Sequence, residues 1–162
     1  MTAELDNVTE TGIESFKIKD RQMWMGVLAR GALPILEKVW ADFPNKPKYN
    51  FLRSPELGMA MVRARAGGEG ARFNLGEMTI TRCVVRTEDG YMGQSYVAGR
   101  NLRHAELCAV FDALLQNATH RMELQNQLIA PLQLEMNKKR KDTAKKVATT
   151  RVDFFTMVRG ED

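Results

Sequence analysis

The residues best suited to chemistry in this 162-residue chain are arginines. No lysine lies between Lys48 and Lys138, whereas nine arginines do. Arginine is favoured where a planar guanidinium must pair with a carboxylate or phosphate, or where a charge lies in an interface. Three interpretations stay open: internal ion pairs, a subunit interface, and direct phosphate contact. The candidate contacts are Arg63, Arg65, Arg72, Arg82, Arg86, Arg100 and Arg103, together with His104.

Strand periodicity predicts how some of these arginines are grouped. Arg63 and Arg65 should share one strand face, as should Arg82 and Arg86, because side chains two apart in a strand point the same way. On a buried face they would need acidic or phosphate partners, since an unpaired buried charge is costly. The candidate acidic partners are Glu77, Asp89, Glu106 and Asp112.

A glycine-rich segment is a further candidate for anion binding. Gly67, Gly68 and Gly70 would allow backbone N–H groups to point at an anion. The segment lacks the lysine and hydroxyl residues of a P-loop, so a connection between two strands is the favoured interpretation.

Arg100, Arg103 and His104 surround a predicted helix start at Asn101, and helix N-termini bind anions well. His104 and Glu106 do not face each other on a helix, which argues against an acid–base pair. A structural or interface histidine is therefore favoured. No nucleophile arrangement or pair of catalytic carboxylates is found, so the catalytic residues stay unknown.

Metal and nucleic-acid sites find little support. Cys83 and Cys108 match no metal spacing and are predicted to be free core thiols, and two histidines are too few for a zinc site. The net charge of +4 hints at an anionic partner. Six of the cations crowd into residues 138–146 without interleaved aromatic residues, which favours a solvated helix face over a nucleic-acid stripe.

The hydrophobic pattern predicts an α+β fold with a small antiparallel sheet of three to four strands, packed with N-terminal and C-terminal helices. An N-terminal helix is expected to be capped by Asp20, and Pro34 to open the next helix. Asp89-Gly90 is a hairpin signal. Strands are predicted over residues 57–66, 78–87 and 92–98, and later helices over 102–116 and 132–147.

Residues 1–18 are predicted to be a flexible acidic arm, and residues 19–162 a single domain. The last segment, 151–162, is rich in apolar residues, and exposed phenylalanines would favour association. It should therefore dock on its own domain or on a partner, through Arg151, Phe154, Phe155 and Met157. No apolar run is long enough to cross a bilayer and the N-terminus is unlike a secretory signal, so we expect a cytoplasmic protein with no membrane partner.

Several segments resemble one bacterial family, the G subunit (PhnG) of the carbon–phosphorus lyase core complex, and the resemblance runs from about residue 20 to 160. The N-terminal arm and the lysine cluster are atypical of it. The longest and most distinctive matching segment is residues 151–160. The matching sequences are WMGVLA (24–29), GGEGARF (67–73), TITR (79–82), VR (85–86), GR (99–100), HAE (104–106), LIAPL (128–132) and RVDFFTMVRG (151–160).

The resemblance implies a non-redox subunit that acts with the H, I, J and L subunits, most directly with the I subunit. With the H, I and L subunits it would transfer the ribose triphosphate moiety of ATP to an alkylphosphonate with release of adenine. MgATP would be a substrate of the complex, and this chain alone would bind no cofactor or metal. The alternative is an adaptor that only stabilises the complex. A nucleic-acid-binding protein is a more distant interpretation.

Overall fold

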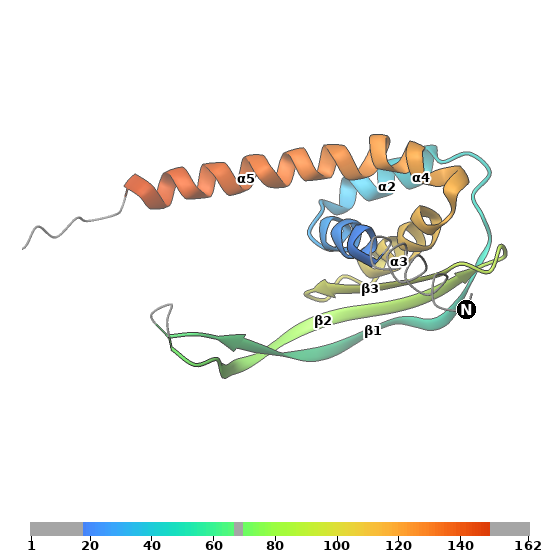
Figure 1. The fold of residues 1–162 in the computed structure, drawn as a ribbon. Coiled ribbons are helices and arrows are strands. Elements are labelled where there is room, and N and C mark those ends of the chain that lie inside the picture. Colours follow the sequence, from blue (N-terminus) through green and yellow to red (C-terminus); the bar gives the residue numbers. More distant parts are fainter. Residues whose placement is uncertain (1–17, 67–69, 150–162) are drawn as a thin grey trace, which may run out of the picture.

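The computed structural model describes residues 18–66 and 70–149, which form the predicted α+β fold. Three antiparallel strands make one sheet in the order β1-β2-β3, and the helices lie on one face of it (Figure 1). The sheet has three strands, at the lower end of the predicted range. The strands are β1 (Tyr49–Ala64), β2 (Phe73–Thr87) and β3 (Met92–Ala98).

Two strands begin earlier than predicted, at Tyr49 and Phe73. In β1 the pairing register shifts between Arg53 and Glu56, around Pro55. Proline cannot donate to a strand ladder, and it is tolerated here because β1 is an edge strand with an irregularity at that point. A further shift next to Gly76 leaves Leu75 as the extra residue of a bulge.

Six helical segments accompany the sheet within the described residues. Asp20 lies inside the first one, which is helical from at least Ile18, so the prediction that it caps this helix was wrong. The cap at Asn101 is confirmed, because its Oδ1 accepts the His104 N–H at 2.9 Å. The segments are residues 18–28, α2 (Leu33–Asp42), α3 (Leu102–Gln116), α4 (Ala118–Leu124), the π-helical η1 (Gln125–Ile129) and α5 (Ala130–Thr149).

Pro131 does not end the helical path. It follows η1, in which the N–H of Ala130 donates to the Gln125 carbonyl, five residues back. The wider π-helical turn absorbs the carbonyl that a proline ring would otherwise strike. The chain therefore continues straight into α5.

Helix α3 is the centre of the core. Nearly every residue from His104 to Leu115 is buried, because the helix lies between the sheet and the other helices (Figure 1). Gly93 of β3 allows the closest approach: a Cβ there would lie 1.9 Å from the Ala109 carbonyl oxygen and 2.6 Å from the Ala113 nitrogen. A glycine is thus required where the edge strand contacts this helix.

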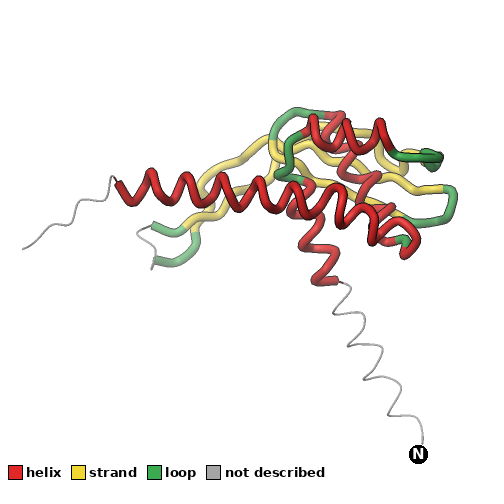
Figure 2. The backbone as a smooth tube through the Cα atoms, turned by 90° about the horizontal axis from the view of Figure 1, so that it is seen from above, coloured by secondary structure: helices red, strands yellow, loops and turns green. Residues whose placement is uncertain are grey.

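Two elements project from this core in the same direction, as the perpendicular views of Figures 1 and 2 show. One is the C-terminal part of α5. The other is a two-stranded β-arm, residues 57–64 and 73–80, of which residues 59–64 and 73–79 lie past the end of β3. Among the described residues, no helix is both long and apolar enough to cross a bilayer.

Candidate functional site

The arginines of the central sheet lie on its open face. Arg82 and Arg86 pair with Tyr96 and Met92, whereas the alternate residues of β2, such as Thr81, are buried beneath the helices. These arginines therefore do not lie on a buried face and need no buried partner. The Arg82 side chain is 39% exposed, and its charge is balanced at the surface.

Glu56 organises a small ion cluster on that open face. Its Oε1 accepts from Arg82 Nε at 2.7 Å and from Arg53 Nη1 at 2.9 Å. The hydrogen bond from Arg82, followed by the charges of both arginines, lowers the pKa of the Glu56 carboxyl below its ordinary value. Glu56 was not among the predicted acidic partners, because the proximity of these side chains depends on the register of β1 against β2.

Other candidate arginines are exposed and have no acidic partner among the residues that the structure describes. Arg63 lies near the end of β1, and Arg65 falls just after it, so these two do not share a strand face. Gly70, from the predicted anion-binding segment, is also exposed. The exposed candidate arginines without an ion pair are Arg63, Arg65, Arg72, Arg86 and Arg100.

The start of α3 is held together by its own side chains. Arg103 Nη1 lies 2.9 Å from Glu106 Oε2, and the Tyr49 hydroxyl donates to Glu106 Oε1 at 2.6 Å. Burial, reinforced by this carboxylate, raises the pKa of Tyr49 to about 12. His104 is buried, and its Nε2 lies 3.0 Å from the Leu28 carbonyl oxygen. Of the candidate residues Arg100, Arg103 and His104, only Arg100 has no hydrogen-bond or ion-pair partner within the described residues.

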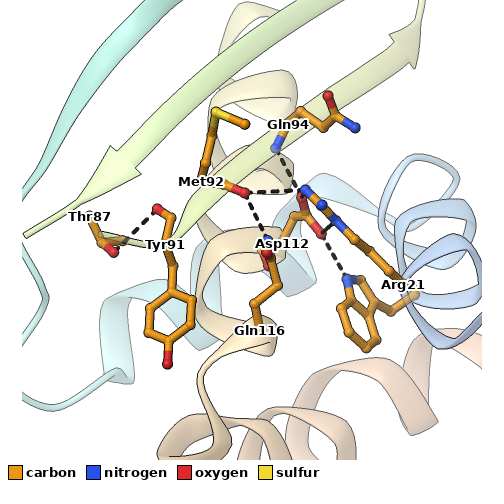
Figure 3. A network of polar contacts seen from close by, with 8 residues as sticks. Arg21, Thr87, Tyr91, Met92, Gln94, Asp112 and Gln116 are labelled. Carbon is orange, nitrogen blue, oxygen red and sulfur yellow. Dashed lines mark hydrogen bonds and ion pairs between the residues drawn. The ribbon is translucent and has the colours of Figure 1, made fainter. Parts of the chain in front are cut away.

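A buried polar network centres on Asp112, whose side chain is 1% exposed (Figure 3). Its Oδ2 accepts from Arg21 Nη2 at 2.7 Å and from the Gln94 N–H at 2.9 Å. Its Oδ1 accepts from Trp24 Nε1 at 2.9 Å and from Arg21 Nε at 3.2 Å. The network joins the N-terminal helical segment, α3 and the edge of β3.

Asp112 was a predicted partner for arginines of the sheet, and the structure gives it Arg21 instead. The sequence signal was present, since Asp112 is the one acidic residue in the buried run from Leu107 to Leu115. A buried carboxylate in such a run requires a cation and several donors. Its partner could not be read from the sequence because Arg21 is 91 positions away.

Two surface clefts carry cations. One of about 400 Å³ is lined by Arg21 and Arg121 beside Trp24 and Tyr91. Both guanidinium groups are already held, Arg21 by Asp112 and Arg121 by the carbonyls of residues 115 and 116. The other cleft, about 430 Å³, lies between the N-terminal helical segment and α5.

The described part of the chain presents no arrangement for nucleophilic or metal chemistry. No group of three potential metal ligands is found within residues 18–66 and 70–149. Cys83 and Cys108 are free, buried thiols, as predicted. Burial raises the pKa of Cys83 to about 11 and that of Cys108 further, so neither thiol is an activated nucleophile.

Several predicted contacts lie outside the described residues. These are two glycines of the anion-binding segment, the whole predicted docking tail and most of the acidic arm. They therefore stay predictions. The individual residues are Gly67, Gly68, Arg151, Phe154, Phe155 and Met157.

Comparison with known proteins decides the family. The profile of the family described as "Phosphonate metabolism protein PhnG" matches residues 19–160. The chain belongs to the PhnG family. It is also 43% identical, over 148 residues, to a protein of Rhizobium meliloti (strain 1021) named "Alpha-D-ribose 1-methylphosphonate 5-triphosphate synthase subunit PhnG". That match covers 90% of this chain and 92% of the relative. A subunit role in phosphonate metabolism agrees with a fold that offers binding groups but no catalytic constellation in its described part.

Proposed function

We propose that this chain acts with H, I and L subunits to transfer the ribose triphosphate moiety of ATP to an alkylphosphonate, releasing adenine. The observation that carries the proposal is the 43% identity, over nearly the full length, to a relative named as a subunit of alpha-D-ribose 1-methylphosphonate 5-triphosphate synthase. In this reaction a phosphonate oxygen attacks the anomeric carbon of the ribose. The N-glycosidic bond breaks, and adenine leaves with the bonding electrons and takes up a proton.

The role that we assign to this chain is to shape a site on the I subunit, its most direct partner. MgATP and the alkylphosphonate would bind as substrates of the complex, in the cytoplasm, and this chain would hold no cofactor of its own. Excluding water and orienting the phosphonate would contribute several kcal/mol, within the roughly 7–11 kcal/mol available from orientation. A J subunit would act on the product afterwards, in a separate redox step.

Exposed arginines support a contact with anionic groups across the assembled complex. Arg86 and Arg100 are exposed and have no acidic partner within the described residues, so their guanidinium groups are available for a phosphate or a partner carboxylate. Arg82, by contrast, is already paired with Glu56. The arginines that could act on a ligand are thus distinguished from one that is satisfied within the chain.

The test is a reconstitution with and without this chain. The H, I and L subunits, MgATP and methylphosphonate are mixed, and the phosphorus-containing products are followed by ³¹P NMR. The triphosphate ester should form only when this chain is present. Arg86→Ala and Arg100→Ala should slow ester formation while the complex still assembles, and Arg82→Ala serves as the matched control.

A second candidate is a purely structural adaptor, favoured by the absence of a catalytic constellation in the described residues. It predicts equal ester formation without this chain once the other subunits are stably assembled. It also predicts that Phe154→Ala/Phe155→Ala weakens assembly and that no substitution in this chain changes which product forms.

A further inference from the structure

The β-arm exposes apolar side chains on the face that the rest of the sheet buries. Leu57, Met59 and Met61 stand opposite Thr81, Thr79 and Glu77 in the register of β1 and β2. Opposite residues share a face, and Thr81 lies on the face that the helices cover. The three apolar side chains thus form a strip on the helix side of the arm, yet they are 53%, 70% and 52% exposed. The β-arm reaches beyond the part of the sheet that α3 covers (Figure 1).

The C-terminal part of α5 is exposed at every position from 137 to 149. It carries six cations and one acidic residue, Asp142. A helix of about 13 residues is marginal without tertiary contacts, and neighbouring like charges weaken it further. A helix that is polar on nearly all sides either bridges to another surface, is held by i,i+4 pairs such as Glu135–Lys139, or is marginally stable.

Arm and helix project from the same end of the molecule, with α5 on the helix side of the sheet, where the apolar strip lies (Figures 1 and 2). The strip ends at Arg63, which is exposed, and Arg65 and Arg72 flank the arm. An apolar strip bordered by arginines, together with a cationic helix, matches a ligand that has apolar side chains and carboxylates. Within the projecting residues only Glu77 and Asp142 carry the opposite charge, and Glu135, just before residues 137–149 on α5, pairs with Lys139 at 2.6 Å.

We propose that the β-arm and residues 137–149 of α5 together hold an acidic, amphipathic segment of a partner subunit. Its apolar side chains would cover Leu57, Met59 and Met61, and its carboxylates would pair with the lysines of α5 and with Arg63. This inference rests on the proposed function, which supplies the partner subunits. It adds the surface that they use and the chemistry of the segment that occupies it.

Charge complementarity favours this occupant over two others. The chain's own residues 151–162 contain two arginines and three acidic residues, so their charges nearly cancel. A second copy placed face to face would bring the same cations together, which is unfavourable. A partner segment rich in Asp and Glu has neither problem.

The first test is photo-crosslinking in the assembled complex. Full-length chain carrying a photoreactive amino acid at Met59 is co-expressed with the H, I and J subunits, irradiated after purification, and analysed by mass spectrometry. A matched chain carries the same group at Met78, which is exposed on the opposite face of the arm. We expect a covalent product with an acidic segment of a partner subunit at Met59, and little or none at Met78.

The second test measures affinity for the complex of H, I and J subunits. Met59→Asp should raise Kd by about ten- to a hundredfold, because it removes one buried apolar side chain and adds a charge that acidic groups repel. Met78→Asp should change Kd by less than about threefold, the effect of an ordinary surface substitution. Lys141→Glu/Lys145→Glu should weaken binding most at low salt, since screening reduces the wild-type attraction.

Several outcomes would overturn the docking proposal. Crosslinks from Met59 to residues 150–162 would assign the strip to the chain's own tail, and crosslinks to a second copy would assign it to self-association. Equal effects of Met59→Asp and Met78→Asp, or no effect of either, would equally refute it. If ester formation still required the chain, the proposed function would survive that failure. If Met59→Asp abolished binding but the ester formed without the chain, docking would stand and the synthase role would fall.

Discussion

Replacing Asp112 with asparagine would keep the shape of the buried side chain but would remove its charge and one acceptor. Each carboxylate oxygen accepts two hydrogen bonds, from Arg21 and Trp24 on one side and from Arg21 and the Gln94 N–H on the other. Whichever way the new amide is turned, its NH₂ group must face two donors. At least one buried donor is then left without an acceptor, and Arg21 loses its counter-ion.

The expected loss of stability follows from these contacts. An unsatisfied buried donor costs about 1–3 kcal/mol, and a broken buried ion pair costs about 3–5 kcal/mol. Because the Arg21 side chain is 30% exposed, solvent replaces part of the lost interaction. We expect Asp112→Asn to lower the free energy of unfolding by about 3 kcal/mol, which for a chain of this size lowers Tm by about 6–12 °C.

Urea denaturation followed by tryptophan fluorescence measures this change, since Trp24 itself contacts the network. Glu106→Gln, on the same helix, is the matched control. In its ion pair the Arg103 side chain is 43% exposed, and the glutamine oxygen can still accept from the Tyr49 hydroxyl, so the substitution should cost less than about 1 kcal/mol. If Asp112→Asn cost no more than Glu106→Gln, the view that the buried carboxylate holds the N-terminal helical segment to the sheet and α3 would be wrong.

Two further predictions concern a close contact and a titration. Gly93→Ala should lower the free energy of unfolding by more than about 3 kcal/mol or prevent folding, because the new Cβ would overlap the backbone of Ala109. Gly76→Ala is the control: no atom lies within 4 Å of its Cβ position, so it should change the free energy of unfolding by less than about 1 kcal/mol. Thermal unfolding of both variants measures the difference. The folded-state pKa of Tyr49 is raised from 10 to about 12, so its contribution to stability is present below pH 10 and is lost as pH rises toward 12. Tyr49→Phe should reduce the fall in the free energy of unfolding between pH 10 and 12. If that fall were unchanged, the Tyr49 hydroxyl would not be the group that links stability to pH in this range.

Signals that depend on near neighbours could be read directly from the sequence. The Asn101 cap, the Asp89-Gly90 turn and the helix opened by Pro34 are all observed. Each involves residues within three or four positions of one another, so that the local backbone alone determines the outcome. The α+β class and the buried cysteines follow from the same patterns of polarity. The family was also recognisable, because its motifs are short runs of adjacent residues.

Contacts between distant segments were decided only by the tertiary structure. The pairing of Asp112 with Arg21 depends on how the N-terminal helical segment packs on α3, and that of Glu56 with Arg82 on a strand register with three shifts. The exposure of Met59 and Met61 in the apolar strip depends on β1 and β2 continuing past the end of β3. Alternation along a strand predicts which side chains share a face, but whether another element covers that face depends on the lengths and packing of segments far away in the chain.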